Sequence, residues 1–203
     1  MAQVAFETLA DELRIDIPEV VDALAIREVR NIAIDFCERT RCWKFEQDTI
    51  ITTTNSEYDM EPPSGAVVSE IIRVEYGGTI LVGKPYEKLI NYTSGATQYY
   101  GMINPKVIRL SPTPVAGKAL DMLVVLKPST TAKRIEDYIF NEYSDAFRHG
   151  ALMRLFAMAN KPWTDGSLAG YHRDEYRDLI DVITTKSETG GVRTTHTVQY
   201  GGI

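Results

Sequence analysis

Residues 136–158 have the sequence EDYIFNEYSDAFRHGALMRLFAM, and their apolar side chains recur at helical spacing on two faces. One face carries Ile139, Tyr143, Ala146, Gly150, Met153 and Ala157, and the other carries Phe140, Phe147, Ala151, Leu155 and Met158. A helix that is apolar on two faces is buried among other elements. Glu136 and Asp137 fall in its first turn, where they complement the helix dipole. The sequence therefore predicts a central helix in a helical core.

Three further helices are expected around the central one. Residues 18–42 form the longest of them, because Pro18 fits a first turn and an apolar stripe follows at Val21, Ala25, Val29, Ile32 and Phe36. A shorter helix precedes it over about residues 4–13. The segment 160–162 (NKP) ends the central helix, and Thr164 or Asp165 can cap a last helix that carries Leu168, Tyr171, Tyr176, Leu179 and Ile183.

Between the helices the period changes, because residues 45–128 consist of short β-favouring runs broken by turn residues. The expected strands are 45–54, 67–76, 79–82, 98–103, 106–110 and 119–127. Gly77-Gly78 is typical of a two-residue hairpin loop. The predicted fold class is α+β: a helical core over 1–44 and 129–186, an inserted β lobe over 45–128, and an extended C-terminal arm over 187–203.

The arm has little apolar mass but alternates in the pattern of a strand after Gly190-Gly191. An isolated strand cannot satisfy its own backbone groups, so such a tail becomes ordered by adding to the sheet edge of another protein. A tail that is simply disordered is the alternative.

The charge and the apolar content of the chain restrict the functions that it can have. The 203 residues carry a net charge of −6, and no segment of the chain is basic. Tight DNA binding needs clustered Lys and Arg, whereas a mildly acidic surface suits a protein that DNA passes without sticking. No apolar run approaches the roughly 20 residues that span a bilayer, and residues 1–10 lack a signal-peptide layout. We therefore expect no membrane partner and folding in a cytoplasm.

The sequence offers no constellation for catalysis or metal binding. His149, His172 and His196 form no metal-ligand spacing with Cys or carboxylates, and the first two are assigned surface or packing roles. The glycine pairs lack the strand, loop and helix context of a phosphate loop. Cys37 and Cys42 are interpreted as a buried thiol and a helix-end thiol. We expect no enzyme activity, no cofactor and no metal.

Two segments carry a resemblance to a known family: residues 37–44 (CERTRCWK) at a helix-to-strand junction, and residues 150–155 (GALMRL) followed by Lys161-Pro162-Trp163. Together with the element order over residues 18–183, they resemble the head-to-tail adaptor proteins of tailed bacteriophages, also called head completion, connector or tail tubular proteins. These segments are packing signatures and contain no catalytic motif.

The resemblance implies a structural virion protein at the head–tail junction, assembled in the host cytoplasm. Its subunits would form a ring, twelve-fold in this family, that joins the portal protein to a tail or nozzle protein and carries the DNA channel. The isolated chain is expected to be largely monomeric. The alternatives are a monomeric binding module and a small enzyme with no recognisable motif.

The resemblance also assigns contact residues. Portal contact falls on the arm residues Val192, Arg193, Thr194, Thr195, His196, Thr197, Val198, Gln199 and Tyr200. Tail-side contact is expected on loops of the β lobe at Tyr76, Gly77, Gly78, Thr79, Ile80, Gly95, Tyr99, Tyr100 and Met102.

Overall fold

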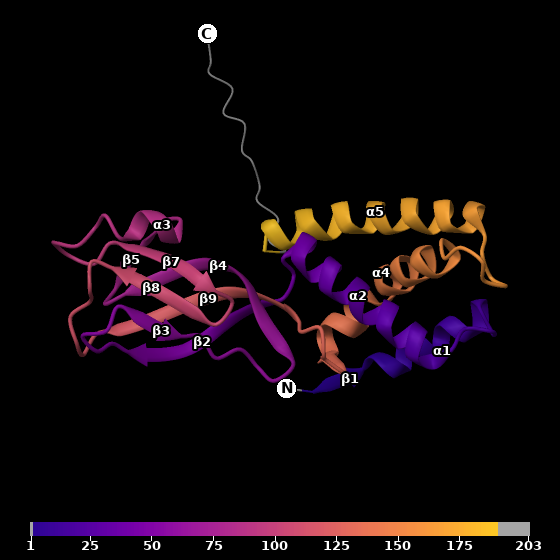
Figure 1. Cartoon of the computed structure of the whole chain (residues 1–203), viewed down its shortest axis with the longest axis horizontal. Coiled ribbons are helices and arrows are strands. Elements are labelled where there is room, and N and C mark those ends of the chain that lie inside the picture. Colours follow the sequence, from indigo (N-terminus) through magenta and orange to yellow (C-terminus); the bar gives the residue numbers. More distant parts are fainter. Residues whose placement is uncertain (1, 191–203) are drawn as a thin grey trace, which may run out of the picture.

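The chain forms an elongated molecule with helices at one end and β-sheets at the other (Figure 1). The computed structural model describes residues 2–190. The helical half contains α1 (Phe6–Asp16), α2 (Asp22–Thr40), α4 (Asp137–Phe156) and α5 (Gly166–Glu188). Two short strands, β1 (Gln3–Ala5) and β10 (Arg134–Glu136), pair antiparallel at the junction between the halves. The mixed α+β class is confirmed.

Helix α4 is the centre of the helical half, as its two apolar faces predicted, because α1, α2 and α5 all pack against it. The Phe36 ring of α2 meets the Phe147 ring of α4 edge-on, with centroids 5.0 Å apart. At Gly150 the helices approach so closely that an added Cβ would lie 2.7 Å from Ile32 Cγ2 and 3.0 Å from Tyr176 Cε2. The helix is kinked at Tyr143, which has non-helical backbone angles.

The start of one helix agrees with the sequence prediction, and the starts of the three others differ from it. Asp165 caps α5 as expected, accepting hydrogen bonds from Ser167 N (2.8 Å) and Leu168 N (3.0 Å). The prediction that α2 begins at residue 18 is wrong, because residues 17–21 form a turn and a short extended segment between α1 and α2. The first helix starts at Phe6 and not at Val4, because Val4 pairs with Ile135 in the β1–β10 ladder. Glu136 likewise belongs to β10.

The β half contains two four-stranded sheets, with strand orders β2-β9-β4-β5 and β3-β8-β7-β6. The strands are β2 (Lys44–Ile51), β3 (Glu57–Asp59), β4 (Ala66–Tyr76), β5 (Thr79–Ile80), β6 (Val82–Gly83), β7 (Tyr99–Asn104), β8 (Val107–Ser111) and β9 (Ala119–Pro128). A single helical turn, α3 (Tyr86–Leu89), precedes β7. The sequence prediction omitted β3 and α3.

Three strand predictions can be compared directly with the sheets. The Gly77-Gly78 hairpin is confirmed: Tyr76 pairs with Thr79, and both glycines have positive φ. The predicted strand 79–82 is divided at the buried Leu81, because Val82 pairs with Tyr99 of the other sheet. The predicted strand 45–54 ends at Ile51, because the Thr52 hydroxyl turns to hydrogen bond with the loop before β9.

The two halves share one continuous set of buried side chains. Trp43 is buried at the junction, and its carbonyl accepts a 2.8 Å hydrogen bond from Leu126 N of β9. Helix α2 also packs against β9. The linking segments therefore hold the sheets against the helices. That residues 45–128 form a separate inserted lobe stays a prediction.

Candidate assembly surfaces

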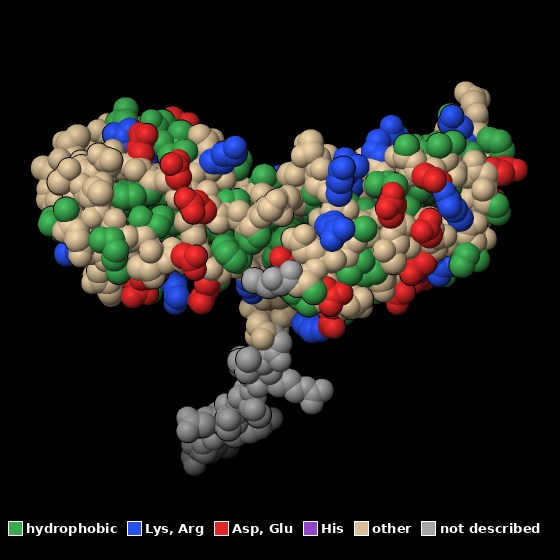
Figure 2. All heavy atoms as spheres, turned by 90° about the horizontal axis from the view of Figure 1, so that it is seen from below, with side chains coloured by type: hydrophobic (Ala, Val, Ile, Leu, Met, Phe, Trp, Pro, Cys, Tyr) green, Lys and Arg blue, Asp and Glu red, His purple; other side chains and the backbone are tan. Residues whose placement is uncertain are grey.

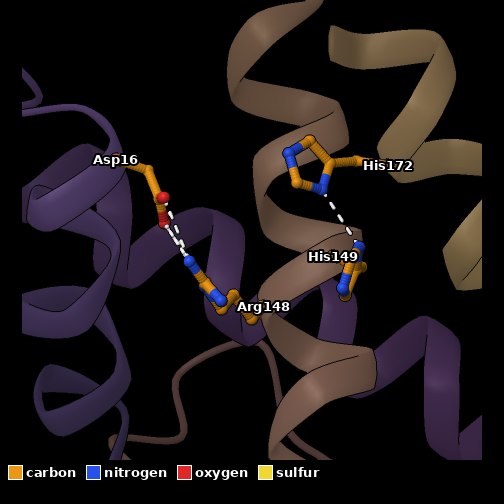
Figure 3. A network of polar contacts seen from close by, with 4 residues as sticks. All are labelled: Asp16, Arg148, His149 and His172. Atoms are coloured by element: carbon orange, nitrogen blue, oxygen red, sulfur yellow. Dashed lines mark hydrogen bonds and ion pairs between the residues drawn. The ribbon is translucent and has the colours of Figure 1, made fainter.

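A polar network connects α1, α4 and α5 on the helical half (Figure 3). Arg148 of α4 binds the Asp16 carboxylate through Nη2, at 2.9 and 3.0 Å, and through Nε at 3.3 Å. This fork geometry fixes the end of α1 on the central helix.

Next to this pair, His149 of α4 faces His172 of α5, with their Nδ1 atoms 3.0 Å apart (Figure 3). One Nδ1–H must donate to the other nitrogen, so the contact requires at least one neutral ring. Phe156 stacks on His172 at 5.7 Å. Burial, together with the neighbouring His149 and Arg148, lowers the pKa of His172. Both histidines therefore have packing roles, although the sequence did not reveal that they touch.

Over residues 2–190 no group of three or more His, Cys, Asp or Glu side chains is placed to hold a metal ion. The buried carboxylate of Glu28 in α2 is satisfied by Arg27 (2.8 Å) and Asn31, with Arg154 at 3.8 Å. Such a paired carboxylate has a structural role. None of the described helices is long and apolar enough to cross a membrane.

The two cysteines lie at the C-terminal end of α2 and are both free. The predicted burial of Cys37 is confirmed, since it is 0% exposed. A hydrogen bond with Cys42 and burial raise the pKa of the Cys37 thiol. Cys37 therefore stays protonated and acts as a packing residue.

The first predicted tail-side group, residues 76–80, lies on the β4–β5 hairpin, but its members differ in exposure. Ile80 is 64% exposed. The side chain of Tyr76 is instead buried, and its hydroxyl donates to Val115 O (2.9 Å) and accepts from Val115 N (2.8 Å). Tyr76 thus holds the neighbouring loop in place, and Ile80 is the exposed apolar residue of the hairpin.

The second predicted group lies in the other sheet and in the loop before it. Gly95 is exposed and has a φ of +99°. Tyr99 packs its ring against that of Tyr92 at 4.3 Å, and both Tyr100 and Met102 are partly buried. The short link from β5 to β6 connects the two sheets, because Val82, two residues after Ile80, pairs with Tyr99.

Sequence reasoning missed two exposed apolar residues beside the hairpin, Ile51 (63%) and Val115 (66%). Thr52 Oγ1 donates to Val115 O at 2.9 Å, and Tyr76 binds the same carbonyl. Ile51, Ile80 and Val115 thus share the end of the β2-β9-β4-β5 sheet that lies away from the helices, and we call them the distal tip. The exposure of Val115 could have been predicted, because it is an apolar residue within the turn-rich segment 112–117.

The predicted portal-binding residues 192–200 lie outside the described part of the chain. The helix that precedes them is anchored at the junction. Ser187 Oγ donates to Arg41 O at 3.0 Å, and Lys44 Nζ donates to Ser187 O at 2.6 Å.

Charged side chains are interspersed on the surface. Figure 2 shows acidic and basic groups mixed over both halves of one face, with no continuous basic tract. This pattern agrees with the net charge of −6, and this face does not provide the phosphate-neutralising surface of a tight DNA binder.

The comparison with protein families is decisive, because the family model described as SU10 adaptor protein matches residues 2–198. The chain belongs to the SU10 adaptor protein family. The match includes both the helical half and the β half of this SU10 adaptor, and it confirms the predicted resemblance to phage head-to-tail adaptors. Such adaptors are structural proteins. No curated protein is significantly similar to the chain.

Proposed function

We propose that this adaptor forms a ring between the portal and the tail of a phage particle, with the DNA channel along its axis. The observation that carries the proposal is the family match over residues 2–198, which covers every element of the described fold. A ring of identical subunits, twelve-fold in the proposal, needs two different surfaces on each chain, one for each neighbour.

Portal contact is assigned to residues 192–200. The support is the fixed origin of this segment: the hydrogen bonds of Ser187 to Arg41 and Lys44 tie the end of α5 to the junction. An alternating segment that leaves a fixed point can add as a strand to a sheet edge of the portal. Avidity across the ring then adds to each single contact.

Tail-side contact is assigned to the distal tip. Its three exposed apolar residues lie at one end of a sheet, where a partner can bury apolar surface against all of them. Ile80 belongs to the residues predicted from sequence, and Ile51 and Val115 extend that surface. The DNA channel is not assigned to particular residues. Its support is the net charge of −6, because an acidic surface repels phosphates and lets DNA slide.

The test is the mass of the purified chain, alone and mixed with portal rings, for the full-length protein and for a version truncated after Ser187. The full-length chain is expected to join the portal as a ring, and the truncated chain is expected to remain free. The Ile80→Ser variant serves as a matched control, because it should join the portal like the wild type. If the full-length chain does not join any portal ring, the proposal is wrong.

A further inference from the structure

A cavity of about 300 Å³ at the junction gathers basic side chains. Arg30 of α2 lines it together with Lys133 and Arg134, which lie at the start of β10, and Glu7 is the one acidic group of its lining. A neighbouring cavity of about 350 Å³ is also lined by Lys133 and Arg134. Lys133 and Arg134 therefore lie between two surface cavities.

These three cations have no carboxylate partner among residues 2–190, although most arginines of the described chain do. Arg30 donates from Nη1 to Thr130 O at 2.7 Å, while its Nε is buried without a hydrogen-bond partner. Three cations and one carboxylate, that of Glu7, line the cavity, so positive charge is in excess there and an incoming anion would be favoured. The chemistry of the cavity thus suits carboxylates.

The chain itself offers a surface of the complementary kind. A cavity of about 320 Å³ between β2 and β3 is lined by Asp48, Asp59 and Glu61, with Phe45 and Ile50 beside them. These three carboxylates are exposed and take part in no ion pair with a described residue, and no Lys or Arg lines this cavity.

We propose that the basic junction cavity of one copy receives the acidic β2–β3 edge of a second copy. Two different surfaces of one chain then meet, which is the kind of contact that closes a ring when it is repeated by rotation. A protein partner is favoured over DNA, because the cations are confined to one small junction on a chain of net charge −6. This inference rests on the proposed ring and names its subunit contact.

The direct test is zero-length carbodiimide cross-linking, which joins a lysine amine to a carboxylate in contact with it. A mixture of unlabelled and ¹⁵N-labelled full-length chains, concentrated or assembled on portal rings, separates links between copies from links within one chain. Mixed-isotope links from Lys133 to Asp48, Asp59 or Glu61 are expected. Lys133 links only within one chain, or to other carboxylates, would overturn the inference.

A charge swap supplies the second test. The K133E/R134E and D59K/E61K double variants should each lower the fraction of concentrated chains that sediment as complexes of two or more copies at least about tenfold, and an equimolar mixture of the two should recover part of it. Sedimentation is the readout because these variants remove the groups that carbodiimide joins. The control is K88E on the exposed turn α3.

The outcomes separate this inference from the proposed function. If wild-type chains form rings on the portal and K133E/R134E does so equally well, the contact is wrong and the adaptor function stands. If a short DNA duplex shields Lys133 from acetylation and a second copy does not, the cavity binds nucleic acid and the inference fails. If wild-type chains form no ring on the portal, the proposed function is wrong, and the subunit contact inferred from it is wrong as well.

Discussion

The helical half and the β half use their surfaces in different ways. In the helical half, ion pairs such as Arg148–Asp16 and a histidine contact tie the helices to one another. In the β half, an apolar tip and an acidic cavity are left without partners within the described chain. The helical half exposes apolar residues as well, such as Ile15 (82%) and Val182 (67%). The proposed division of roles is that the β half supplies the tail-side surface, whereas the helical half carries the portal-binding segment and, through Arg30, part of the contact between copies.

The strongest test of this contrast is the Phe147→Ala substitution in the helical core. Phe147 is 1% exposed and packs edge-on against Phe36, so its truncation should lower the free energy of unfolding by about 3–5 kcal/mol. Because buried side chains run continuously into the sheets, urea unfolding followed by tryptophan fluorescence and by circular dichroism should give coincident curves. Two separated transitions would instead make the halves independent units.

Within the hairpin, substitution of Tyr76 should affect stability, whereas substitution of Ile80 should affect binding. Tyr76→Phe removes two hydrogen bonds to Val115 and should cost about 1–3 kcal/mol of stability. Ile80→Ser changes an exposed side chain, so its effect on stability should stay within about 0.5 kcal/mol, while binding to the tail protein weakens. Chemical denaturation and a tail-protein binding assay check the pair. An Ile80→Ser variant with normal tail binding would remove the tip from the contact surface.

Two glycines of the helical half give a finer comparison. Gly150→Ala should destabilise the protein by about 1–2 kcal/mol, because the new methyl group meets Ile32 and Tyr176. Gly170→Ala on α5 meets nothing within 4 Å and should stabilise by about 0.5–1 kcal/mol through helix propensity. Thermal unfolding of both variants measures the contrast. Equal effects of the two substitutions would show that α4 is less tightly packed than described.

The smallest expected effect is a pH dependence of the helical half. The folded protein lowers the pKa of His172, mainly through burial, so the unfolded chain takes up the proton more readily. Stability is therefore fully present above the ordinary histidine pKa of about 6.5 and decreases as the pH falls through it. Urea midpoints at pH 7.5 and 5.5 should differ less in His172→Gln than in the wild type. An unchanged difference would assign the pH dependence to other groups.

Local patterns allowed much of this fold to be predicted. The central helix, the Asp165 cap and the Gly77-Gly78 hairpin depend on residues close in sequence. The β1–β10 pair could not be predicted, because three-residue strands are stabilised only by a partner about 130 residues away. The burial of Tyr76 and the contact between His149 and His172 likewise depend on tertiary packing.

The candidate surfaces could be predicted from the sequence only in part. Ile80 was identified from the turn chemistry around it, whereas Ile51 and Val115 join it through the Thr52 and Tyr76 hydrogen bonds to the Val115 loop. Lys133 and Arg134 are adjacent in sequence, but Arg30 lies about 100 residues before them, so the sequence alone did not mark their cavity.

The division of roles between the two halves is tested most directly by electron cryomicroscopy of portal rings carrying the full-length adaptor. The account predicts a ring in which residues 192–200 lie on the portal and the distal tips point away from it, toward the tail. A ring with its distal tips against the portal, or portal rings that carry no adaptor, would contradict it.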